Sequence, residues 1–86
     1  MWILYLIQNT ESKEIYFGIT SDLKKRLQAH NSGGKKFTTR NKGEWILVYA
    51  EAYRSKEDVL TRERRLKVHG SGKIELIKRL TNSMLD

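Results

Sequence analysis

Two short apolar segments near the start of the chain, each carrying a tyrosine, constrain the fold more than any other feature. Residues 2–8 are almost wholly aliphatic and aromatic, and residues 14–20 resume that pattern after a polar, turn-like stretch. Each segment is too short for a helix, so the pair is typical of two strands joined as a β-hairpin. Ten residues separate Tyr5 from Tyr16, which predicts two phenols on neighbouring strands. Gly18, inside the second segment, predicts close approach of another backbone or of a ligand.

Helical periodicity and a further apolar run predict the rest of the secondary structure. Leu23 and Leu27 lie four residues apart, as on the buried stripe of a helix, and Ser21 is the expected N-cap of that helix. The segment from Gly70 to Gly72 is expected to end the helix before it. The predicted elements after the hairpin are a helix over residues 22–31, a loop over 32–44, a strand over 45–53, and helices over 56–69 and 73–82. The chain is therefore expected to be a small α+β domain with the order β-β-α-β-α-α.

Composition limits the classes of function open to the chain. Its 86 residues predict one domain over residues 1–86, and 17 basic against 10 acidic residues leave a net charge of +7. This charge favours an anionic partner, either nucleic acid or an anionic membrane surface. No apolar run approaches the ~20 residues needed to span a bilayer, and the absence of cysteine excludes disulfides and thiolate zinc sites. We expect a soluble cytoplasmic protein.

Glu63 is the most informative single residue because it interrupts an apolar stripe. Val59, Glu63 and Leu66 lie at positions i, i+4 and i+7, so the carboxylate is expected to face the sheet. A carboxylate in apolar surroundings is costly unless it pairs with a cation or a metal. Two interpretations stay open: an ion pair with Lys67 or Arg62, and a role as metal ligand or catalytic acid.

Arg26 and His30 lie four residues apart and therefore on one side of their helix. Arg26 can hold a phosphate through two parallel hydrogen bonds, although a solvated helix charge is the commoner role of an isolated arginine. His30 can contact a phosphate or carry a proton, or it can simply interact with the helix dipole. Tyr5 and Tyr16 are either core residues or proton carriers. The pKa of a phenol is near ~10, so its use as a base at pH 7 requires a nearby cation or metal.

A basic segment follows the hairpin. Between Leu23 and Gly43 the chain has seven lysines and arginines and no acid, interleaved with glycines and threonines that suit phosphate contacts. The alternative is a solvated, mobile loop with no binding role. The candidate nucleic-acid-binding residues are Lys24, Lys35, Lys36, Thr38, Arg40 and Lys42.

Taken in order, these motifs resemble the GIY-YIG endonuclease family, in particular a stand-alone domain similar to the N-terminal nuclease domain of an excision-repair endonuclease. The resemblance extends over nearly the whole chain. Either tyrosine motif alone is a weak signal, whereas all the segments at these spacings are a strong one. The segments that carry the resemblance are Ile3-Leu4-Tyr5, Tyr16-Phe17-Gly18, Thr20 to Leu27, His30 to Gly33, Lys36 to Arg40, Trp45 to Tyr49 and Arg62 to Lys67.

The resemblance implies a three-stranded antiparallel sheet flanked by helices, and cutting of phosphodiester bonds with one divalent cation. It implies that Glu63 is the only protein ligand of Mg²⁺ or Mn²⁺, with water and phosphate oxygens as the other ligands. Tyr16 would be the general base toward the attacking water, and Tyr5 would orient that water or the phosphate. Arg26 would stabilise charge in the transition state, and His30 would assist proton transfer or hold the scissile phosphate.

These observations together predict a metal-dependent DNA endonuclease with a one-metal mechanism and a role in DNA repair or processing. The expected partners are DNA, with RNA as an alternative substrate, and a partner protein that supplies targeting. No membrane partner is expected. The competing prediction is a basic nucleic-acid-binding module of the same fold without catalytic turnover.

Overall fold

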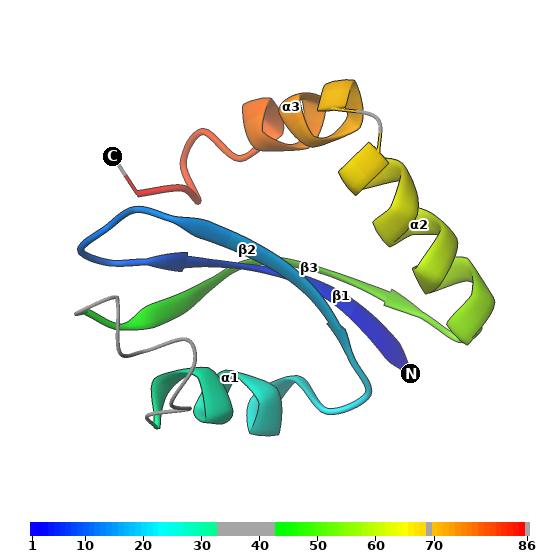
Figure 1. Ribbon diagram of the computed structural model, residues 1–86, viewed down its shortest axis with the longest axis horizontal. Coiled ribbons are helices and arrows are strands. Elements are labelled where there is room, and N and C mark those ends of the chain that lie inside the picture. The colour runs from blue at the N-terminus through cyan, green and yellow to red at the C-terminus, as the bar shows by residue number, and fades with distance from the viewer. Residues whose placement is uncertain (33–42, 69, 86) are drawn as a thin grey trace.

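A three-stranded antiparallel sheet, as predicted from the sequence, is confirmed by the computed structural model of the chain, which describes residues 1–32, 43–68 and 70–85. Its strands are β1 (Trp2–Asn9), β2 (Ile15–Thr20) and β3 (Trp45–Tyr53), in the order β2-β1-β3 (Figure 1). The central strand, β1, pairs antiparallel with both neighbours. The fold is therefore α+β, with the predicted element order β-β-α-β-α-α.

Three helices cover the two faces of the sheet. The first, α1 (Leu23–Asn31), lies against one face, whereas α2 (Lys56–Val68) and α3 (Gly70–Arg79) lie against the other (Figure 1). Within the described ranges, no helix is both long and apolar enough to cross a membrane.

The core has two apolar layers because β1 is buried on both faces. Alternate residues of a strand point to opposite faces, so Leu4 and Leu6 point toward α2 and α3 while Tyr5 and Ile7 point toward α1. The first layer also contains Phe17, Val59, Leu66 and Leu76, and the second contains Trp45 with Leu23 and Leu27 packed against it. This double burial explains why the sequence of β1 is apolar without alternation.

The N-cap of α1 differs from the one predicted. Asp22, not Ser21, is the N-cap, and its side chain accepts a hydrogen bond from the backbone N–H of Lys25 at 3.1 Å. The hydroxyl of Thr20 accepts from the backbone N–H of Asp22, which holds the turn that leads out of β2. A carboxylate at this position also interacts favourably with the helix dipole, which a serine hydroxyl cannot do as strongly.

The glycines after α2 begin a helix instead of forming a loop. We expected residues 70–72 to separate two helices, but α2 ends at Val68 and α3 already begins at Gly70. A Cβ atom at Gly72 would lie 3.5 Å from the carbonyl oxygen of Arg65 and 3.8 Å from a methyl carbon of Leu66. At these distances an added Cβ atom would make ordinary van der Waals contact, so the start of α3 packs on the end of α2, and this packing outweighs the low helix propensity of glycine.

Candidate active site

The hairpin register brings the two tyrosines together. The strands β1 and β2 pair so that Tyr5 stands opposite Gly18 and Ile7 stands opposite Tyr16. Tyr5 and Tyr16 are therefore diagonal neighbours on the α1 side of the sheet, with ring centroids 6.3 Å apart. Their adjacency is what the spacing of the two sequence motifs predicts.

Gly18 makes room for the phenol of Tyr5. A Cβ atom at position 18 would lie 2.3 Å from Tyr5 Oη and 2.4 Å from Tyr5 Cζ, far inside van der Waals contact. The ring of Tyr5 therefore crosses the edge strand β2 at its single glycine. The close approach predicted from a glycine in this strand is present, but the approaching group is a side chain of the neighbouring strand.

The first helix contributes an arginine and a histidine to the same cluster. Arg26 Nε donates a hydrogen bond to Tyr5 Oη at 3.2 Å, and His30 Nε2 lies 3.1 Å from the same oxygen. The imidazole is buried, with 4% exposure, and its ring centroid is 5.2 Å from that of Tyr16. Since a guanidinium can only donate, the phenol proton of Tyr5 is available for Nε2 of a neutral His30. Spacing by one helical turn thus directs both α1 side chains to one phenol.

Burial dominates the electrostatics of this cluster. It raises the pKa of Tyr5, and the hydrogen bond and positive charge of Arg26 offset that increase only in part. Burial also lowers the pKa of His30, and the Arg26 charge lowers it further, so the imidazole is neutral at pH 7. The hydrogen bond to Tyr5 raises the pKa of Arg26. An adjacent cation therefore does not by itself make Tyr5 more acidic, because desolvation of the phenolate outweighs the attraction.

Glu63 approaches the cluster from α2. Val59 and Leu66, its neighbours on the helical stripe, are buried, whereas the Glu63 side chain is 24% exposed. Its negative charge is among the causes that raise the pKa of Tyr5, so the carboxylate lies within electrostatic range of that phenol. Lys67 Nζ lies 3.3 Å from Glu63 Oε2, as the ion-pair interpretation of the sequence expects. Because the Lys67 side chain is 57% exposed, an i,i+4 pair of this kind contributes only about 0.3–0.5 kcal/mol.

The donor set around Glu63 fits Mg²⁺ or Mn²⁺ better than it fits zinc. In the part of the chain that the structure describes, no three His, Cys, Asp or Glu side chains gather closely enough to hold a metal between them. Mg²⁺ keeps several water ligands and is commonly bound by one or two carboxylates together with substrate phosphates. A partly exposed carboxylate with one weakly held lysine meets that requirement. Zinc, which takes three or four protein ligands, has no such set among the described residues.

A second polar cluster, which the sequence analysis did not identify, joins β3 to α2. The Glu51 carboxylate accepts two hydrogen bonds of 3.0 Å from Arg62, and it also accepts from the hydroxyls of Tyr49 and Tyr53. Burial is the largest single influence and opposes ionisation of Glu51, but the hydrogen bonds from Arg62, Tyr49 and Tyr53 together with the Arg62 charge outweigh it and lower the pKa of the carboxyl group. Burial and the Glu51 contact raise the pKa of Tyr53 to about 12. The signal in the sequence is the alternation Tyr-Ala-Glu-Ala-Tyr, since residues i, i+2 and i+4 of a strand share a face. Arg62 is therefore paired with Glu51 and not with Glu63.

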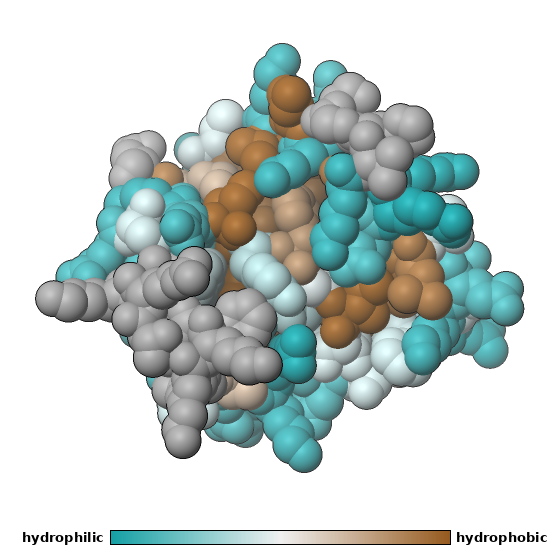
Figure 2. Space-filling view, in the orientation of Figure 1, coloured by the Kyte–Doolittle hydropathy of each residue, from teal (hydrophilic) through white to brown (hydrophobic). Residues whose placement is uncertain are grey.

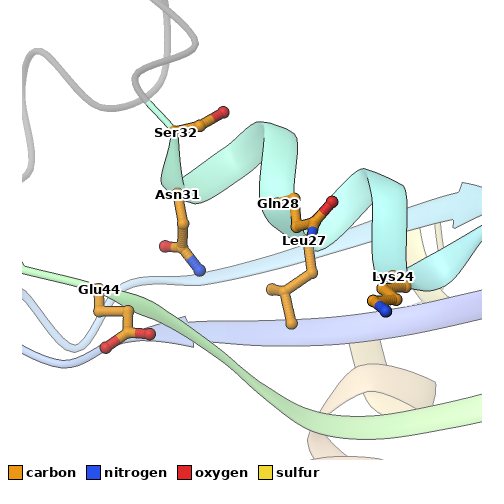
Figure 3. A pocket seen from close by; sticks show the side chains of 6 residues that line it. All are labelled: Lys24, Leu27, Gln28, Asn31, Ser32 and Glu44. Atoms are coloured by element: carbon orange, nitrogen blue, oxygen red, sulfur yellow. The ribbon is translucent and has the colours of Figure 1, made fainter.

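Of the six candidate nucleic-acid-binding residues, only Lys24 lies within the residues that the structure describes. Lys24 is exposed on α1, where it lines a shallow pocket of about 660 Å³ together with residues of α1 and the segment before β3 (Figure 3). Leu27 and Asn31 point from α1 toward the sheet in this view. The Asn31 side chain bonds both the backbone N–H and the carbonyl oxygen of Trp45, which ties α1 to β3. Outside the described residues lie Lys35, Lys36, Thr38, Arg40 and Lys42.

Known proteins are similar to this chain in sequence and in fold. The family model for the GIY-YIG catalytic domain matches residues 1–75. The UPF0213 protein YhbQ of Escherichia fergusonii is 37% identical, and that of Escherichia coli K12 is 36% identical, each over 92% of this chain and 89% of the relative. The solution NMR structure of the UPF0213 protein BH0048 from Bacillus halodurans is similar, with a TM-score of 0.56 and 29% identity over 94% of this chain and 86% of that one. The chain therefore belongs to the GIY-YIG family of nuclease domains.

Proposed function

We propose that the chain is a divalent-metal-dependent endonuclease that hydrolyses phosphodiester bonds in DNA, as a single domain over residues 1–86 acting in cytoplasmic DNA repair or processing. The observation that carries the proposal is the convergence of side chains on one phenol. Arg26 and His30 both contact the Tyr5 hydroxyl, and Tyr16 lies beside it. Glu63 adds a carboxylate from a third element. A tyrosine that served only the core would not require an arginine and a neutral histidine on its hydroxyl.

Arg26 is suited to bind the scissile phosphate. The residue is exposed, and its guanidinium has N–H groups beyond the Nε that Tyr5 engages. Arg26 also lines a polar pocket of about 470 Å³ at the start of α1, with Thr20 and Lys25 among its other residues. Negative charge grows on the phosphate oxygens during hydrolysis, and a guanidinium held by a phenol can stabilise that charge without reorganising.

The two tyrosines and His30 can move the proton of the attacking water. In the proposed mechanism Tyr16 takes this proton on its hydroxyl oxygen and gives up its own hydroxyl proton to solvent as the water oxygen bonds to phosphorus. A solvent water protonates the leaving oxygen as its bond to phosphorus breaks. Tyr5 keeps its proton at neutral pH because its pKa is raised, so it orients the water or the phosphate by hydrogen bonding. The neutral imidazole of His30, 3.1 Å from Tyr5 Oη, can accept a proton through that phenol.

Glu63 would hold the divalent cation, Mg²⁺ or Mn²⁺, with water and phosphate oxygens as the remaining ligands. A cation bound there supplies Lewis-acid activation of the phosphate and stabilisation of the leaving oxygen. Lys67 has to release the Glu63 carboxylate for this to happen, and the small contribution of an exposed i,i+4 pair allows it.

The proposal is tested with a panel of labelled DNA structures incubated with and without Mn²⁺. The proteins compared are the wild type, Glu63→Gln and the control Glu75→Gln, which changes an exposed acid on α3. We expect Glu63→Gln to lose at least about 100-fold in cleavage rate, the effect of removing one group that stabilises the transition state. Its melting temperature and DNA affinity should change little, and Glu75→Gln should cut normally. Undiminished cleavage by Glu63→Gln, or cleavage by the wild type in EDTA, would refute the metal role.

A DNA-binding module of the same fold without turnover is the second candidate. The Glu63–Lys67 contact favours it, because the carboxylate that would hold a metal ion is already paired with an ammonium group. Salt-dependent binding to the panel without any cleavage would support this candidate over the endonuclease. RNA strands in the same panel test whether RNA is also a substrate.

A further inference from the structure

A groove runs between the edge strand β2 and the helices α2 and α3. Figure 2 shows apolar surface along the junction of the sheet with these helices, bordered by hydrophilic side chains. The groove has a volume of about 280 Å³, just below the about 300–1,000 Å³ typical of small-molecule sites. Its lining residues are Ile15, Tyr16, Phe17, Leu66, Lys67 and Lys73.

The groove is continuous with the candidate active site because two residues belong to both. Tyr16 lies in the aromatic cluster with Tyr5 and His30, and it also lines the groove. Lys67 contacts the Glu63 carboxylate at 3.3 Å and lines the groove as well. A chain that occupied the groove would therefore pass directly to the phenols and to Glu63.

The groove combines an apolar floor with positive charge. Phe17 and Leu66 are buried, and Lys73 Nζ lies 5.8 Å from the centroid of the Phe17 ring. Among its lining residues, Lys67 and Lys73 are charged, and both are cationic. No carboxylate of the described residues lines the groove. A nucleotide has this same combination of an apolar face and an anionic phosphate, whereas a neutral peptide strand has no group for two ammonium ions.

We propose that this groove binds the nucleotide adjacent to the phosphodiester that lies at the active-site cluster, with Lys73 and Lys67 contacting its phosphate. The inference rests on the proposed function, since it concerns a nucleic-acid strand that crosses the Tyr5–Arg26–Glu63 site. The inference extends that function because it assigns a nucleotide-binding subsite between β2, α2 and α3, away from α1.

The first experiment measures DNA binding in EDTA, which removes the divalent cation that the proposed cleavage requires. Fluorescence anisotropy gives the affinity of the wild type, Lys73→Gln and the control Lys78→Gln for labelled single-stranded and duplex oligonucleotides over a range of salt concentrations. Lys78 is an exposed lysine of the same helix that does not line the groove. Lys73→Gln should reduce the slope of log K against log salt by about 0.7–0.9, the contribution of one phosphate contact, and Lys78→Gln should leave it unchanged.

A second experiment locates the nucleotide. Thymidine 3′,5′-bisphosphate, titrated in EDTA, should shift the NMR signals of the Ile15, Phe17 and Lys73 amides in the wild type and not in Lys73→Gln. Lys73→Gln loses a cation–π contact with Phe17 worth only about 0.5–1 kcal/mol, so it should still fold, which its melting temperature checks.

The outcomes separate this inference from the proposed function. Equal salt slopes for Lys73→Gln and Lys78→Gln would overturn the groove assignment even if the wild type cuts DNA. If sedimentation shows that the wild type is a dimer and that Lys73→Gln is not, the groove is assigned to a second copy of the chain. That result would also overturn the nucleotide assignment. Binding that depends on Lys73 without any cleavage in Mn²⁺ would support the groove and refute the endonuclease. No binding of the wild type to any oligonucleotide would refute both.

Discussion

Replacement of Gly18 with alanine should displace the phenol of Tyr5 and with it the hydrogen bonds that define the site. The new methyl group would lie 2.3 Å from Tyr5 Oη, 2.4 Å from Cζ and 2.8 Å from Cε1. Carbon contacts are optimal at about 3.5–4.0 Å, so the ring has to move by more than about 1 Å. The contacts of Oη with Arg26 at 3.2 Å and His30 at 3.1 Å cannot both survive such a shift.

The cost follows from two effects. Overpacking of a core costs about 1–3 kcal/mol, and each hydrogen bond on the Tyr5 hydroxyl contributes about 0.5–1.5 kcal/mol. We therefore expect Gly18→Ala to lower the free energy of unfolding by about 2–4 kcal/mol. Gly18 is not in the left-handed region, so backbone strain adds nothing to this figure. In a domain of this size the melting temperature should fall by about 8 °C or more.

Urea unfolding of a double-mutant cycle measures this coupling. The four proteins are the wild type, Gly18→Ala, Tyr5→Leu and the double variant. Leucine lacks the ring atoms that the new methyl group would meet, so Gly18→Ala should cost less than about 0.5 kcal/mol in the Tyr5→Leu background. It can even be slightly stabilising there, because alanine restricts the unfolded chain more than glycine does. An equal cost in both backgrounds would show that the phenol is not what requires the glycine.

Three further predictions concern other parts of the chain. Because the pKa of His30 is lowered in the folded protein, the unfolded state binds a proton more readily. The neutral imidazole therefore contributes its full stabilisation of the fold above the ordinary pKa of about 6.5, and this stabilisation is lost as the pH falls below that value. The melting temperature should accordingly fall between pH 7.5 and 5.5, as calorimetry can measure, and less steeply in His30→Gln. Glu51→Gln should lower the free energy of unfolding by about 1–3 kcal/mol in urea titration, since it leaves a partly buried guanidinium without its counter-ion; an unchanged midpoint would contradict the structural role of that pair. Neutral replacement of Lys35, Lys36 and Arg40 together should weaken DNA binding similarly across sequences and flatten its salt dependence; a loss confined to some sequences would argue against backbone contacts.

Local patterns were sufficient for most of the architecture. The hairpin, the third strand and the helices follow from apolar runs and from repeats of three to four residues, because a period along the chain translates directly into a face of a strand or helix. The meeting of Tyr5 with Tyr16, and that of Arg26 with His30, are likewise consequences of hairpin register and helical spacing. Each depends only on residues that are close in sequence or joined by one turn.

The remaining features depend on packing between distant segments. Adjacent residues of a helix do not face each other, which disfavours Glu63 as the partner of Arg62. The pairing of Arg62 with Glu51, however, requires β3 and α2 to lie side by side, and no local pattern indicates it. The start of α3 at Gly70 likewise depends on contact with the end of α2, which outweighs the helix propensity of glycine.

The amino-acid sequence by itself thus determined the elements, their order and the set of side chains available for chemistry, because those properties are local. Only the tertiary structure decided the chemical state of that set. A phenol beside an arginine is expected to become more acidic, yet Tyr5 is less acidic than an exposed tyrosine because the sheet and α1 exclude water from it. Desolvation is a property of all the atoms that surround a group, so it is settled when the chain packs.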